Sequence, residues 1–183
     1  ATTVRRDSLL VVRVRLTGGE FGNPRARVDA MHAVRARVRT LPGVAAETLS
    51  SAGAWLGIGP RDRVIVECGE CFRAYMYMPY DAPVMAHFTI MPGFFDVLGI
   101  ALEDGRAVEP VDEEGTKHVA LVNLPLASRH FEDEKPIGRH ARPYGFLTPP
   151  HRIVGVAPAI TASVLGASSW LDFAMYFSML QYP

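Results

Sequence analysis

The stretch from Phe88 to Arg106, FTIMPGFFDVLGIALEDGR, constrains the fold of this chain more than any other part. Phe88 and Ile90 alternate with their neighbours at the two-residue period of a half-buried strand. Pro92 suits the first turn of a helix, where its missing N–H is not needed, and Gly99 suits a left-handed cap at the end of that helix. One face of the helix would be apolar, formed by Phe94, Val97 and Leu98. The stretch predicts a strand, a tight turn and a short helix that serves packing rather than chemistry.

The length and composition indicate one globular domain, or two small lobes that share a core. The chain has 183 residues, of which 49% are hydrophobic and 21% are charged. Its 19 basic and 19 acidic residues cancel, which argues against a nucleic-acid binder. Residues 1–66 hold eleven Arg and five acidic residues, a net of +6, so the remainder carries −6. Two solvated faces explain this split better than a charged docking surface.

No segment of the sequence is predicted to span a membrane. Val154 to Leu171 carries no charge, but Pro158, two Gly and four Ser or Thr interrupt it. A membrane-spanning helix needs about 20 mostly apolar residues. The N-terminus also lacks the basic-then-apolar pattern of a signal peptide. We therefore expect residues 1–183 to form a single domain without a membrane segment.

The N-terminal third is predicted as strand, helix and strand. Leu9 to Leu16 alternates apolar residues with Arg, as in a strand with one wet face. Pro24 to Leu41 is the clearest helix, since Asn23 can cap it and Pro24 fits its first position. The ending Leu41-Pro42-Gly43-Val44 resembles that of the MacB-like periplasmic core domain, and this resemblance implies that the helix leads into a strand, here Val44 to Leu49. The helix has one apolar stripe, made of Val28, Met31, Val34, Val38 and Leu41.

Arg63 to Met78 is predicted to form a hairpin whose bend contains Cys68 and Cys71. In a turn the Cα atoms of these two residues come within about 7 Å, which is compatible with a disulfide. A redox-active pair would sit at a helix N-terminus, but the residues that follow Cys71 alternate as a strand. We predict a structural disulfide in an oxidising compartment and regard a disulfide oxidoreductase as the weakest of three function classes.

The sequence contains no recognisable catalytic, cofactor or metal site. It lacks a Gly-rich phosphate loop with Lys and Ser/Thr, and it lacks the Gly-x-Ser-x-Gly elbow of hydrolases. No two of its six His residues are spaced three or four apart, which argues against a zinc site on one helix. Three acidic clusters are interpreted as solvated loops with low pKa values: Glu103-Asp104, Asp112-Glu113-Glu114 and Glu132-Asp133-Glu134. We therefore expect a protein that is not an enzyme.

The opening stretch resembles the signature "spGYFevlGipLleGR" of the MacB-like periplasmic core domain, found in permease subunits of ABC transporters of the MacB/FtsX superfamily. The matching residues are Met91-Pro92-Gly93-Phe94-Phe95, Leu98-Gly99-Ile100, Leu102 and Gly105-Arg106. Met91 departs from the family, which usually has Ser or Thr there to cap the helix.

Further matches follow in the order and spacing of the family, so the resemblance spans nearly the whole chain. They are Leu121-Val122-Asn123, Ala127-Ser128-Arg129 and Phe131; then Pro136-Ile137-Gly138-Arg139, Arg152-Ile153-Val154-Gly155-Val156, Met175-Tyr176-Phe177 and Gln181. Leu124-Pro125, Ala157-Pro158 and Ser178 depart from the pattern.

The resemblance implies an α+β fold of two lobes. One is a βαβ-type, porter-like lobe built on Arg25 to Leu41, and the other is a mixed α/β lobe around the signature helix. The two lobes would be intertwined subdomains of one domain. The resemblance also implies that this domain lies between transmembrane helices. It implies a location on the periplasmic or extracellular side of the bacterial cell membrane. It also implies that a separate ABC ATPase drives the membrane helices, and that this domain passes the movement to a periplasmic adaptor or substrate. The full-length transporter would be a dimer, and the isolated domain a monomer.

The alternative is an independent extracellular binding module that holds a small apolar ligand between its lobes. Phe72 to Met91 is rich in aromatic residues and Met and could line such a pocket. An interpretation of the same segment as ordinary core and hairpin surface is favoured.

Overall fold

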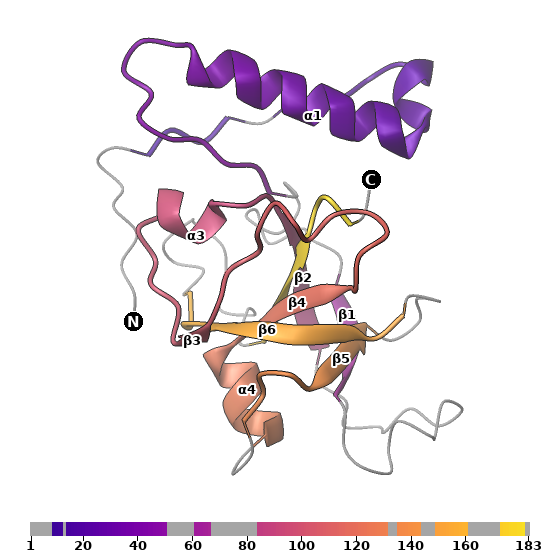
Figure 1. Ribbon diagram of the computed structural model, residues 1–183, viewed down its shortest axis with the longest axis vertical. Helices are drawn as coiled ribbons and strands as arrows, with labels where there is room; N and C mark the ends of the chain where they lie inside the picture. Colours follow the sequence, from indigo (N-terminus) through magenta and orange to yellow (C-terminus); the bar gives the residue numbers. More distant parts are fainter. Residues whose placement is uncertain are drawn as a thin grey trace.

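Figure 1 shows the computed structural model of the chain, in which a β-sheet lies below one long helix. The structure describes residues 9–12, 14–50, 61–66, 84–131, 135–143, 149–160 and 173–181. Helices are interspersed among the strands along the described parts of the chain, and the strands join in one mixed sheet. The predicted α+β class is therefore confirmed, while the division into two lobes stays a prediction.

The described elements are short apart from one helix. The strands are β1 (Arg61–Val66), β2 (Val84–Ile90), β3 (Asp104–Gly105), β4 (Val119–Asn123), β5 (His140–Pro143), β6 (His151–Ala157) and β7 (Ala174–Ser178). The helices are the 3-10 helix η2 (Gly19–Gly22), α1 (Pro24–Arg39), α3 (Phe94–Val97) and α4 (Leu124–Phe131).

The sheet closes on itself. Its strand order is β3-β6-β4-β7-β2-β1-β5, and β5 also pairs with β6, so every strand except β3 belongs to a closed ring. β3 pairs with the end of β6, at Gly155 and Val156, while β5 pairs with its beginning. The β2–β7 and β4–β6 pairs are parallel and the other pairs are antiparallel. Closure leaves fewer unpaired strand edges than an open sheet would.

Two apolar clusters fill the two sides of the sheet. One draws on β2, β4, β5, β6, β7 and α4, that is, on strands around the ring, so it fills the ring's interior. The other lies on the outer side of β2 and β7, beneath α3 and the segment that follows it. β4 and β7 lie between the two clusters, which is why every residue of both strands is buried.

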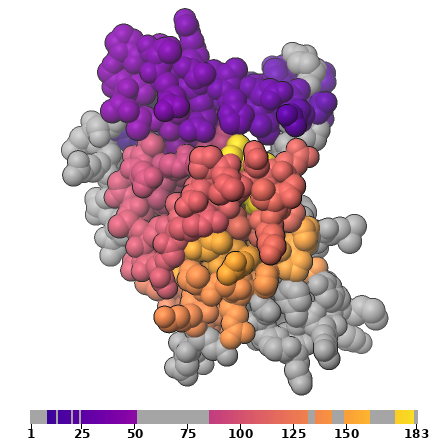
Figure 2. All heavy atoms as spheres, viewed as in Figure 1, coloured from indigo at the N-terminus to yellow at the C-terminus, as the bar shows by residue number. Residues whose placement is uncertain are grey.

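The helix α1 forms a separate layer, seen as the indigo atoms at the top of Figure 2. The Asn23 side chain accepts a hydrogen bond from the Arg25 amide, and Pro24 takes the first helical position, as predicted. A buried carboxylate fixes the helix to the segment that follows it, because Glu47 accepts from Arg35 Nε at 2.7 Å. The predicted helix is confirmed, although it ends at Arg39 rather than Leu41.

Both strands predicted next to α1 are wrong. Residues 9–12, 14–16 and 44–49 belong to no described strand. Only Ser50 makes a bridge, to Ile90. A strand requires a neighbour to accept its hydrogen bonds, and the periodicity of one segment cannot show whether that neighbour is present.

The predicted hairpin is described only in its first arm. β1 covers residues 61–66 and pairs with β2 on one side and β5 on the other. The predicted second arm, with Cys68 and Cys71, lies outside the described residues, so the disulfide stays a prediction.

Candidate functional site

The turn of the signature stretch is built by two glycines with left-handed backbone conformations. Gly93 (φ 83°) precedes α3, so Pro92 lies in the turn before the helix. The prediction that Pro92 lies in the first turn of the helix is therefore wrong. Gly99 (φ 66°) ends the helix as predicted. The Gly99 amide donates to the Asp96 carbonyl oxygen at 3.0 Å, and the Ile100 amide donates to the Phe95 carbonyl oxygen at 2.8 Å. These two hydrogen bonds form the Schellman pattern.

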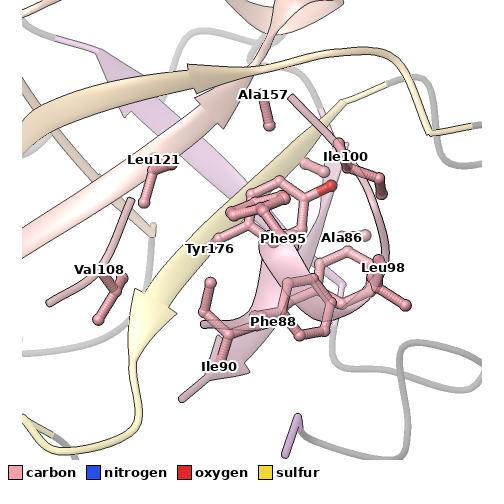
Figure 3. Close-up of a cluster of buried hydrophobic side chains, with 12 residues drawn as sticks. Ala86, Phe88, Ile90, Phe95, Leu98, Ile100, Val108, Leu121, Ala157 and Tyr176 are labelled. Carbon is pink, nitrogen blue, oxygen red and sulfur yellow. The ribbon is translucent and has the colours of Figure 1, made fainter. Parts of the chain in front are cut away.

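The short helix α3 packs aromatic side chains onto the sheet (Figure 3). Phe95 is 1% exposed and meets the Tyr176 ring edge to face, with centroids 5.2 Å apart. Phe88 stacks on the same Tyr176 ring at 5.1 Å. Phe94 and Leu98 are buried in the same cluster. Four residues of helix therefore cover the outer face of β2 and β7, which agrees with the predicted packing role.

Downstream of α3, a pair of glycines lets two backbones touch. Gly105 in β3 lies opposite Gly155 in β6. A Cβ atom on Gly105 would lie 2.2 Å from the Val154 carbonyl oxygen, and one on Gly155 would lie 2.3 Å from the Arg106 carbonyl oxygen. Gly105 also has a φ of 73°. Only glycine fits both positions without displacing the strands.

Arg106, the last residue of the signature, forms a two-pronged ion pair with Asp112. The Nη1–Oδ2 distance is 2.7 Å and the Nη2–Oδ1 distance is 2.9 Å. The Glu109 amide donates to the same carboxylate, and Asp112 is only 4% exposed. The interpretation of this acidic cluster as a solvated loop is therefore wrong for Asp112, because Arg106, six residues earlier, binds its carboxylate.

The ion pair determines the protonation of both partners. Burial alone would raise the pKa of Asp112, but the hydrogen bonds from Arg106 and from the Glu109 amide, together with the Arg106 charge, lower it below the ordinary value. The hydrogen bond to Asp112 raises the pKa of Arg106. Both groups are charged across the physiological pH range, as a structural ion pair requires.

Side chains near the C-terminus tie the same loop to β7. Ser178 Oγ donates to the Asp112 carbonyl oxygen at 2.6 Å. The buried Gln181 side chain accepts from the Val119 amide and donates to Thr116 and to the Lys117 carbonyl oxygen. Gln181 matches the family pattern, and Ser178 replaces its Pro with a hydroxyl that still connects β7 to the loop. Segments more than sixty residues apart are thereby joined at one end of the sheet.

Asn123, another residue that matches the family, connects three elements. Its Oδ1 accepts from the Leu126 amide at 3.2 Å, which caps α4, and from the Ala174 amide at 3.1 Å, where β7 begins. The helix predicted from Pro125 to Phe131 is confirmed with its start one residue earlier.

Three histidines that are far apart in the sequence lie together, two of them against one phenylalanine and the third against one of those two. The His87 and His151 rings lie 4.4 and 4.9 Å from the Phe177 ring, and His118 lies 5.3 Å from His151. Burial, followed by the charges of His118 and His87, lowers the pKa of His151 to about 3. Sequence reasoning missed this cluster because it examined helical spacing, whereas three different strands or strand ends supply the rings.

The described residues of the segment predicted to line a pocket belong to the core. Met85, Phe88 and Met91 are all buried. Among the residues that the structure describes, no group of three or more His, Cys, Asp or Glu side chains is placed to hold a metal ion. Within the same ranges, no helix is long and apolar enough to cross a bilayer. Several residues that match the family, such as Gly105, Asn123 and Gln181, join segments of backbone that are distant in the sequence.

Two solved structures with the same fold come from a transporter and from a putative permease. The extracellular domain of the noncanonic ABC-type transporter YknZ from Gram-positive bacteria matches with a TM-score of 0.51 and 15% identity, over 79% of this chain and 60% of that one. A domain of a putative permease from Porphyromonas gingivalis matches with a TM-score of 0.51 and 18% identity, over 81% and 56%. These likenesses place the chain in the fold class of such domains.

The match of the sequence to a family model shows the family to which this chain belongs. The model of the MacB-like periplasmic core domain matches residues 3–182, so this chain belongs to that family, as its signature implied. The periplasmic region of MacB from Actinobacillus actinomycetemcomitans is 16% identical, with a TM-score of 0.47, over 80% of this chain and 54% of that one. The chain thus spans little more than half the length of these solved chains. No curated protein sequence matches it.

Proposed function

We propose that this chain is the extracytoplasmic domain of an ABC transporter permease and that it passes ATP-driven movement of the membrane helices to a periplasmic partner or substrate. The family match over residues 3–182 is the observation that carries the proposal. The domain would lie on the periplasmic or extracellular side of the cell membrane. A separate ATPase would supply the energy, and this domain would contribute no catalytic residue.

The internal connections support a mechanical role. A domain that transmits movement must hold its segments in a fixed arrangement, because a soft element would absorb the displacement. Ser178 and Gln181 join the loop after the signature to the end of β7, the Gly105–Gly155 contact joins β3 to β6, and Arg106 holds Asp112 within the loop. The first three contacts lie between segments distant in the sequence, so they can carry a displacement from one part of the domain to another.

The proposal can be tested in the full-length permease, assembled in membranes with its ATPase. Asp112→Asn removes the carboxylate charge that holds Arg106, whereas Glu113→Gln removes an exposed charge next to it. We expect Asp112→Asn to lower transport per ATP hydrolysed by about tenfold, within the usual range of coupling energies, and Glu113→Gln to leave it near the wild-type value.

Location is tested separately. A cysteine introduced at the exposed Val111, in a background that lacks Cys68 and Cys71, should react with a membrane-impermeant maleimide in intact cells. Labelling only after lysis would place the domain on the cytoplasmic side and overturn the proposed location. Unchanged transport in Asp112→Asn, with the variant protein folded, would overturn the coupling role.

A further inference from the structure

Charged side chains position the helix α1 within the described part of the chain. Neither apolar cluster of the described residues includes a residue of α1, and none of the described α1 side chains is buried. Most helices in proteins are instead held by the packing of an apolar face. The ion pairs of α1 are therefore the contacts that decide how it sits on the rest of these residues.

Glu47 makes the closest of these ion pairs. Its Oε2 atom accepts from Arg35 Nε at 2.7 Å, and its Oε1 atom lies 3.6 Å from Arg39 Nε. Arg35 and Arg39 are four residues apart, so they lie on the same side of the helix. The Glu47 side chain is only 9% exposed and that of Arg35 is 20% exposed. Salt screens such a pair much less than it screens an exposed one.

Two residues after Glu47, the chain meets the signature stretch. The Met91 amide donates to the Leu49 carbonyl oxygen at 2.9 Å, and Ser50 forms an antiparallel bridge with Ile90. Figure 1 shows this segment running from α1 down to the sheet. An extended chain rises by about 3.3 Å per residue, so only about 7 Å of backbone separates Glu47 from Leu49. The carboxylate that α1 holds is thus closely tied to the signature stretch.

Ile90 passes this connection to several other elements. It is the last residue of β2 and lies directly before the turn at Gly93 that begins α3. The Ile90 carbonyl oxygen accepts from the Met179 amide at 2.9 Å, and Ile90 pairs with Ser178 in β7. The Ser178 hydroxyl in turn holds the loop at Asp112. A displacement that reaches Ile90 therefore acts on α3, on β7 and on that loop.

We infer that Glu47 couples α1 to the signature stretch, so that a displacement of α1 reaches β2 and α3 through this carboxylate. While Arg35 and Arg39 bind Glu47, Leu49 and Ser50 move with α1. The part of Glu47 in transport rests on the proposed function. The link between α1 and the signature stretch does not, because it can be measured without transport.

The link is tested by amide hydrogen exchange in the chain of residues 1–183. Glu47→Ala should raise the exchange rate of the Met91 amide at least about tenfold, because α1 no longer holds the segment that carries its acceptor. The Ile153 amide donates to the Arg139 carbonyl oxygen at 2.7 Å in another part of the ring. Its exchange rate should stay at the wild-type value, which shows that the fold persists.

Three further variants identify the mechanism. Glu114→Ala is the matched control, since Glu114 lies 3.9 Å from Arg25 of the same helix and both side chains are exposed. It should leave the Met91 amide unchanged. Glu47→Ala/Arg35→Ala should exchange no faster than Glu47→Ala alone, because the two residues act as a pair. Glu47→Gln keeps the shape and one acceptor, so it should raise the rate less than Glu47→Ala does.

Unchanged exchange of the Met91 amide in Glu47→Ala, or an equal increase in Glu114→Ala, would overturn the link. If Glu47→Ala also exposes the Ile153 amide, Glu47→Gln decides in its place, and wild-type exchange of the Met91 amide in that variant would overturn the link.

The part of Glu47 in transport is tested in the full-length permease with its ATPase. Glu47→Ala should lower transport per ATP hydrolysed at least about threefold, and Glu114→Ala should leave it near the wild-type value. If Asp112→Asn lowers transport and Glu47→Ala does not, the path through Glu47 is overturned while the coupling role stands. If neither variant changes transport although Glu47→Ala speeds exchange at Met91, the coupling role is overturned while the link stands.

Discussion

At the scale of single residues, this domain depends on buried polar side chains that hold its loops and strands in place. Asp112 is the clearest case, because it is buried and receives two hydrogen bonds from Arg106 and one from a backbone amide. Arg106 is the last residue of the family signature. The arginine at this position is therefore explained by its ion pair with Asp112 rather than by a catalytic role.

Removing the Asp112 charge should destabilise the domain. Asp112→Asn keeps the shape but leaves the Arg106 guanidinium without its carboxylate, so we expect the free energy of unfolding to fall by about 1–3 kcal/mol. Glu113→Gln, on an exposed neighbour, should change it by less than about 0.5 kcal/mol. Denaturant unfolding of both variants measures the difference, and equal effects would show that the ion pair contributes nothing specific.

His151 should make stability depend on pH. Its pKa is about 3 in the folded protein, against 6.5 as the ordinary value, so the unfolded chain binds the proton more readily between these limits. Stability should therefore be fully present above about pH 6.5 and should fall on acidification, at up to about 1.4 kcal/mol per pH unit for this group.

The matched measurement compares His151→Gln with His32→Gln, which changes an exposed histidine of α1. The stability curve of His151→Gln should be flatter between about pH 6 and pH 4, whatever its absolute stability, because the titrating group is gone. His32→Gln should keep the slope of the wild type. The same slope in all three proteins would contradict a neutral, buried His151.

At the scale of secondary-structure elements, α3 shows how a helix of only four residues can be held firmly. Its ends are fixed by Gly93 and Gly99, and its side chains enter a cluster with Tyr176. Such a helix has too few internal hydrogen bonds to be stable alone, so packing must provide its stability.

Truncating the aromatic side chains of α3 should therefore be costly. We expect Phe95→Ala to lower the free energy of unfolding by about 3–5 kcal/mol, because the buried ring leaves a cavity against Tyr176. Asp96→Ala, which changes the exposed side of the same helix, should cost far less. Thermal unfolding compares them, and a loss below about 1 kcal/mol for Phe95→Ala would show that α3 is not part of the core.

The sequence alone predicts that Cys68 and Cys71 lie in the bend of a hairpin. We expect a disulfide in protein purified from an oxidising compartment, with neither thiol open to alkylation. The loop that it closes is very short, so the stabilisation should be at or below the low end of the usual range of about 2–4 kcal/mol. Mass spectrometry without reduction tests the bond. Two alkylated thiols would refute it, and loss of folding in a double Cys→Ser variant would refute the small contribution.

At the scale of the whole molecule, the sheet closes into a ring beneath a separate helical layer (Figure 1). The exposed segment 9–16 lies outside that ring. We propose that a separate ATPase supplies the energy for the movement of this domain. This proposal can be tested by asking whether the isolated chain itself binds or hydrolyses ATP.

The isolated domain should neither bind nor hydrolyse ATP, because its sequence has no Gly-rich loop whose amides could surround the phosphates. Calorimetry with ATP and Mg²⁺ should give no saturable heat, and phosphate release should equal that of buffer. Binding at micromolar concentration would contradict the mechanical role. The separately purified ATPase of the same transporter is the positive control.

The sequence by itself determined the features that depend on neighbours within a few residues. The cap at Asn23 and Pro24 and the apolar stripe defined α1 almost to its ends, and Gly99 defined the end of α3, because capping and helical periodicity act within one or two turns. The resemblance to the family also singled out Gly105, Arg106 and Gln181. It could not show what they contact.

Only the tertiary structure decided which distant segments meet. The burial of Asp112, the packing of His87 and His151 against Phe177 and the closure of the ring through β5 all depend on residues whose separation in the sequence carries no periodic signal. The strand predicted at residues 9–16 was wrong for the same reason. Alternation shows that a segment suits a sheet, but a strand forms only where another backbone completes its hydrogen bonds.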